Sequence, residues 1–167
     1  MYITVADFIR EWKWEASLTQ KVLNGLTEES LKQKVYPEGR TLGRIAWHFT
    51  TNIPEYLAHF GLKANEVDSA EKVPDSAIEI AETFNQISSQ AIKVIENEWT
   101  DQSLLEVQNA FGREETNAQI LFGLIKHIVH HRGQVTILMR QAGLKPFGVY
   151  GPTKEDWSKT GIEKPPL

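Results

Sequence analysis

Apolar side chains recur every three or four residues along four long stretches of this chain. That period matches the turn of an α-helix with one buried face. The stretches span residues 4–24, 41–60, 76–99 and 116–142. Because each such helix must cover its apolar face with another element, the pattern predicts an all-α four-helix bundle.

Cap and stop signals set the ends of these helices. Thr4 with Asp7, and Thr116 with Gln119, have the spacing of a capping box at a helix start. Gly61 and Gly143 stand where the second and fourth helices should stop. The segment 103–115 is less regular, and it predicts a loop or a short hairpin.

The residues after Gly143 predict an extended C-terminal tail. Four prolines and three glycines follow in this part of the chain, which excludes a fifth long helix. Phe147, Tyr150 and Trp157 indicate that the tail, about residues 144–167, packs on the bundle. A length of 167 residues with no linker indicates a single domain over 1–167.

The amino-acid composition argues against several classes of function. The chain has no cysteine, which excludes disulfides, zinc–thiolate sites and a thiol nucleophile of its own. A net charge of −4 gives no basic surface for nucleic acid. No apolar run reaches the ~20 residues that cross a membrane, and the first residues lack a signal-peptide pattern, so we expect no membrane partner and a cytoplasmic location.

Three of the five histidines are placed to converge. His127 and His131 lie one helical turn apart, about 40° in azimuth, at the edge of the apolar arc of the fourth helix. His48 lies at the edge of the apolar arc of the second helix. His130 is turned about 100° away from His131, toward the polar side, and is the poorest candidate.

Side chains on facing helices build the metal sites of bundle cores. Three neutral imidazoles, from His48, His127 and His131, would bind a divalent metal and leave coordination positions for water or substrate. Zinc, nickel, copper and iron all suit such ligands. The alternative is that the histidines are hydrogen-bonded packing residues. The HExxH motif of metalloproteases is absent, which disfavours a peptidase.

Two polar residues are weaker candidates for the same site. Glu55 could serve as a base, a fourth ligand or a partner for a histidine N–H, although a solvent-facing role is the commoner one. Gln134 could orient water or substrate, or bond to a neighbouring helix.

Arg132 lies at an apolar azimuth of the fourth helix, so we expect it to pair with a carboxylate or with backbone carbonyls.

A family resemblance rests on three ordered motifs. The stretch from His127 to Gln134, with the sequence HIVHHRGQ, follows IAWH at 45–48 by some eighty residues, and YGP closes the set at 150–152. Together they resemble the DinB-like (YfiT-like) metalloenzyme family over essentially the whole chain. The resemblance implies an up-up-down-down bundle, a homodimer, and a divalent metal, zinc or nickel most often, held by His48, His127 and His131.

The resemblance also implies two classes of function. Some relatives are thiol-dependent S-transferases or isomerases that use low-molecular-weight thiols, so we expect a small-molecule substrate and a metal-activated thiol. A metal-dependent hydrolase, in which the ion activates water, is the first alternative. The second is a non-catalytic, metal- or ligand-binding stress-response protein.

Overall fold

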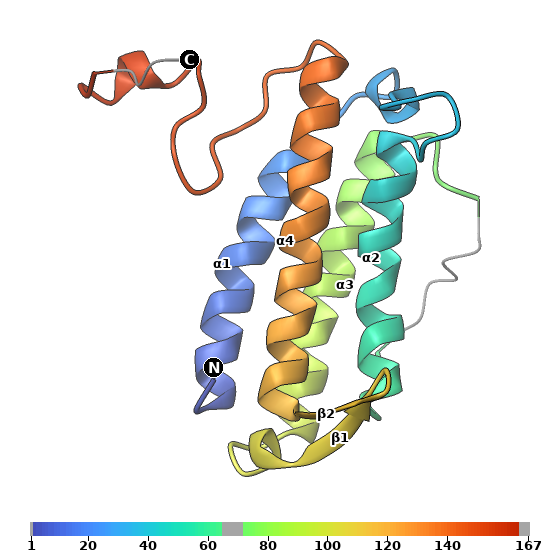
Figure 1. Cartoon of the computed structure of the whole chain (residues 1–167), viewed down its shortest axis with the longest axis vertical. Helices are drawn as coiled ribbons and strands as arrows, with labels where there is room; N and C mark the ends of the chain where they lie inside the picture. The colour runs from blue at the N-terminus through green and yellow to red at the C-terminus, as the bar shows by residue number, and fades with distance from the viewer. Residues whose placement is uncertain (1, 65–71, 164–167) are drawn as a thin grey trace.

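The computed structural model describes residues 2–64 and 72–163, and its main body is a four-helix bundle (Figure 1). The long helices in these ranges are α1 (Val5–Leu23), α2 (Leu42–His59), α3 (Ala77–Glu98) and α4 (Asn117–Gln141). Short 3-10 turns occupy Ser30–Lys32, Ser103–Leu105 and Trp157–Lys159. The predicted bundle is therefore confirmed, with one small hairpin added, β1 (Val107–Ala110) and β2 (Arg113–Thr116).

The helices pack as two parallel pairs. In Figure 1, α1 and α4 run upward, whereas α2 and α3 run downward. Within each pair the helices pack on each other, α1 on α4 and α2 on α3, and across the pairs α1 packs on α3 and α2 packs on α4. In chain order the helices therefore run up, down, down and up, which differs from the up-up-down-down order that the resemblance implied, and α2 lies beside α4.

The helix ends follow the sequence signals. Thr4 and Asp7 form a capping box before α1, and Thr116 and Gln119 form another before α4. Gly143, just after α4, has a φ of 81°, a left-handed conformation that glycine adopts without a Cβ clash. The capping box at Thr116 fixes where α4 starts, and hence the height of its histidines in the bundle.

A close contact between α2 and α4 sets the spacing of the helices that carry the histidines. The Tyr56 hydroxyl donates to the Ile120 carbonyl at 3.0 Å. A Cβ added at Gly123 would lie 2.7 Å from the Tyr56 Oη, so only glycine fits there without a shift. Gly123 lies one turn before His127, which places this contact directly beside the candidate site.

Segment 103–115 contains the short hairpin that was one of two expected outcomes. Ala110 pairs with Arg113 across a two-residue loop of Phe111 and Gly112. Both loop residues have positive φ, 53° and 87°, as a tight hairpin turn of this kind requires.

A buried ion pair joins α1 to α4. Arg132 donates to the Glu15 carboxylate at 2.7 Å, and also to the Glu15 carbonyl and the Thr19 hydroxyl. The expectation that Arg132 pairs with a carboxylate and a carbonyl is confirmed. From the tail, the Tyr150 hydroxyl donates to the same Glu15 carboxylate at 2.8–2.9 Å, and Glu155 pairs with Arg140.

The last four residues of the predicted tail lie outside the described ranges. Within those ranges, no helix is both long enough and apolar enough to cross a membrane.

Candidate metal centre

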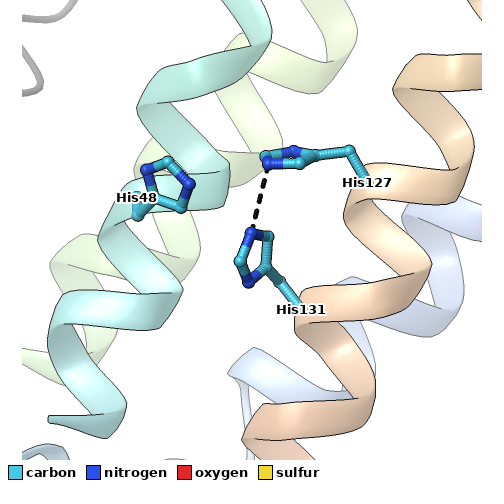
Figure 2. A group of neighbouring side chains, drawn as sticks. All are labelled: His48, His127 and His131. Carbon is cyan, nitrogen blue, oxygen red and sulfur yellow. Dashed lines mark hydrogen bonds between the residues drawn. The ribbon is translucent and has the colours of Figure 1, made fainter. Parts of the chain in front are cut away.

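His48 on α2 lies opposite His127 and His131 on α4 (Figure 2). The ring centroids are 5.4 Å apart for His48 and His127, 4.9 Å for His48 and His131, and 4.5 Å for His127 and His131. One potential ligand nitrogen from each ring lies within 4.8 Å of the other two. The structure thus brings together the three side chains that the sequence singled out.

The spacing of the two α4 rings fits a metal site. His127 Nε2 and His131 Nε2 are 3.1 Å apart. Two metal–nitrogen bonds of about 2.0–2.1 Å that meet at about 90–110° would place their nitrogens roughly 2.8–3.4 Å apart. The two nitrogens therefore already stand at the separation of neighbouring ligands.

Gln134 orients His131. Its Oε1 is 2.7 Å from His131 Nδ1, so this ring nitrogen is the donor and Nε2 keeps its lone pair. Its Nε2 donates to His130 at 3.2 Å. The contact that the structure shows for Gln134 is neither of the two roles considered: it is a hydrogen bond within α4 that fixes the tautomer of His131, an arrangement typical of metal-binding histidines.

Burial keeps the three imidazoles neutral. It lowers the pKa of His127 to about 4, helped by the nearby His131 and His48, and it also lowers the pKa values of His48 and His131. The His127 Nδ1 is buried and has no hydrogen-bond partner in the described part of the chain, so the polar contact of this ring is on its Nε2 side. Neutral imidazoles are the form that a divalent metal requires.

Two arginines and one glutamate influence the electrostatics of the site. Arg44 lies one turn before His48 on α2, and Arg40 precedes that helix. Burial and the neighbouring His131 lower the pKa of His48 most. The two arginines lower this pKa further, whereas Glu55 raises it. These arginines were not among the candidates predicted from the sequence, although the four-residue spacing between Arg44 and His48 was a signal for one of them.

The other candidates lie outside the cluster. Glu55 is half-buried on α2, two turns beyond His48, and is not among the residues whose ligand atoms converge. His130 is exposed and bonds to Gln134, and His59 is exposed beside Phe111. In the described ranges the cluster holds three imidazoles and no carboxylate, which leaves coordination positions for water or substrate.

The lowered histidine pKa values predict how the stability of the metal-free protein depends on pH. In the unfolded chain histidine titrates near 6.5, whereas folded His127 titrates near 4. Between these values the unfolded chain binds more protons, so the free energy of unfolding is largest above about pH 6.5 and falls as the pH drops toward 4. Urea unfolding at a series of pH values measures this. His127→Gln should flatten the slope, and an unchanged slope would contradict the assignment.

Comparison with known proteins agrees with this architecture. A model of the DinB family matches residues 1–164. The uncharacterized protein YrdA of Bacillus subtilis (strain 168) is 43% identical over 167 residues, the whole of both chains.

Two solved structures have the same fold. A DinB-like protein from Bacillus cereus ATCC 10987 is 44% identical, with a TM-score of 0.85 over 90% of this chain and 100% of that one. The DinB-like protein YjoA of Bacillus subtilis is 15% identical, with a TM-score of 0.61 over 88% of this chain and 99% of that one, a likeness of fold alone. With a family match over nearly its full length and relatives above 40% identity, the chain belongs to the DinB family.

Proposed function

We propose that this protein is a divalent-metal-dependent S-transferase, which joins a low-molecular-weight thiol to an electrophilic carbon. The observation that carries the proposal is the cluster of three neutral imidazoles, from two helices, with no carboxylate among them. Such a donor set holds a metal and leaves it accessible to a substrate.

Each residue of the site has a defined part in this proposal. His48, His127 and His131 hold the ion, zinc or nickel in the first instance, and Gln134 keeps the His131 Nε2 lone pair directed into the site. A bound divalent ion lowers the pKa of a thiol and so supplies a thiolate near neutral pH. Since the chain has no cysteine, that thiol must come from a cosubstrate. In the overall reaction the thiol proton passes to solvent, a carbon–sulfur bond forms, and the leaving group departs with its bonding electrons.

A conjugation assay tests the proposal. Tag-free protein loaded with zinc or nickel is mixed with chlorodinitrobenzene and either bacillithiol or glutathione, and chloride displacement is followed by absorbance. We expect turnover that requires thiol and metal. The variant His131→Ala should lose it, whereas His130→Ala, which alters an exposed neighbour, should keep it.

The same preparations separate the alternatives. Metal-dependent hydrolysis of esters or amides without thiol, and no conjugation, would replace the proposal with a hydrolase. Absence of both activities in fully metal-loaded protein would favour a non-catalytic, metal-binding role. The homodimer and the small-molecule partner stay predictions; light scattering after size-exclusion chromatography checks the first.

A further inference from the structure

The β1–β2 hairpin meets α2 at one end of the bundle (Figure 1). A pocket of about 550 Å³ lies between them. Its walls are partly aromatic and partly polar. They are formed by Asn52, Glu55, Tyr56, Ala58, His59 and Phe111, which we call the hairpin pocket. Two larger pockets of the described surface, one of about 660 Å³ between α1 and the end of α3 and one of about 640 Å³ beside the start of α2, contain no histidine.

The hairpin pocket lies next to the metal centre. On α2, His48, Asn52, Glu55 and His59 fall within about 60° of azimuth, so they form one stripe along the helix. At ~1.5 Å per residue, Asn52 lies about 6 Å along the axis from His48 and His59 about 16 Å. A molecule in the pocket can therefore reach toward the three histidines.

Phe111 is an unusual residue for its position. It occupies the first place of a tight hairpin loop with a φ of 53°, where asparagine or glycine is preferred and a bulky side chain is strained. The residue is nevertheless 67% exposed. Its ring lies edge-on to His59, with 5.4 Å between the ring centroids, and its centroid is 5.9 Å from that of the Tyr56 ring. The turn thus holds an aromatic surface open at the pocket mouth.

Glu55 gives the pocket its charge. This carboxylate is half-buried, and no described residue donates a hydrogen bond to it or forms an ion pair with it. On the hairpin, Arg113 and Glu115 pair with each other at 3.0 Å and so compensate one another. An uncompensated carboxylate beside two aromatic rings attracts a cation and repels an anion.

We propose that the hairpin pocket binds an aromatic, amine-bearing group of the electrophilic substrate. Tyr56 and Phe111 contact the ring, and Glu55 accepts from the ammonium group. The assignment of this group to the electrophile rests on the proposed function. The binding preference of the pocket rests only on the three side chains named here, and anionic aromatic compounds are disfavoured at this site.

Three matched probes test the preference on metal-free protein without thiol. Benzylamine, benzyl alcohol and benzoate are titrated separately, and backbone amide shifts are followed by NMR. We expect shifts concentrated at Tyr56, His59 and Phe111, with benzylamine binding about five- to tenfold more tightly than benzyl alcohol, and benzoate most weakly. Equal affinities for all three, or shifts confined to other parts of the chain, would overturn the proposal.

Two variants separate binding from folding. Glu55→Gln should bring the affinities for benzylamine and benzyl alcohol to near equality. Phe111→Asn suits the turn better and should keep or raise the melting temperature, while weakening all aromatic probes severalfold. A lower melting temperature with unchanged probe binding would assign Phe111 to hairpin packing and refute its role here. Because neither metal nor thiol is present, this result is independent of the conjugation assay.

Discussion

Replacing His127 with alanine is expected to abolish stoichiometric metal binding. The change removes one of three converging nitrogens and leaves His48 and His131 as an incomplete pair. After loading with zinc or nickel and dialysis, elemental analysis should find about one ion per wild-type chain and a residual amount in the variant. The effect should be a loss of occupancy and not of fold, since removal of a neutral ring leaves no buried charge behind.

His130→Ala is the matched control for that experiment. His130 stands three residues from His127 on the same helix, but it is exposed and lies outside the cluster. It should retain full occupancy, with at most a modest loss of affinity through its bond to Gln134. Equal metal content in the two variants would refute the ligand assignment.

The largest effect on stability should come from Glu15→Ala. Glu15 is 7% exposed and Arg132 2%, and the substitution leaves a buried guanidinium without its carboxylate. Breaking a buried pair in this way costs about 3–5 kcal/mol. For a chain of this length that lowers the melting temperature by on the order of 10 °C, which calorimetry measures directly.

Two controls identify the cause. Lys72→Ala breaks an ion pair whose side chains are more than 80% exposed, and it should leave the melting temperature nearly unchanged. The double variant Glu15→Ala with Arg132→Met removes both buried charges and should be more stable than Glu15→Ala alone. If the double variant were the less stable of the two, the unpaired charge would not explain the loss.

The fold was predictable because its causes are local. Helix period, capping boxes and terminal glycines act within a few residues of one another, and the observed ends at Thr4, Thr116 and Gly143 follow from them. The convergence of His127 with His131 is equally local, since residues four apart on a helix share a face. Only the addition of His48 required an assumption, that α2 and α4 are neighbours, which the structure confirms.

The features that the sequence did not predict depend on which side chains of different elements meet. Glu15 lies on the same buried face of α1 as Phe8 and Trp12. The helical period of α1 does not reveal that Arg132 of α4 lies opposite Glu15. The hairpin pocket was missed for a similar reason, because a two-residue loop brings Phe111 onto α2 from far along the chain. Helical periodicity specifies which faces are buried, and it leaves the pairing of individual side chains across elements undetermined.

X-ray absorption spectroscopy at the metal edge, on tag-free protein loaded with zinc, tests the three-histidine centre most directly. It should show about three imidazole ligands and at least one exchangeable oxygen ligand at roughly 2.0–2.1 Å. Fewer than three imidazoles, or a shell closed by a protein carboxylate with no exchangeable oxygen, would contradict the open centre formed by His48, His127 and His131.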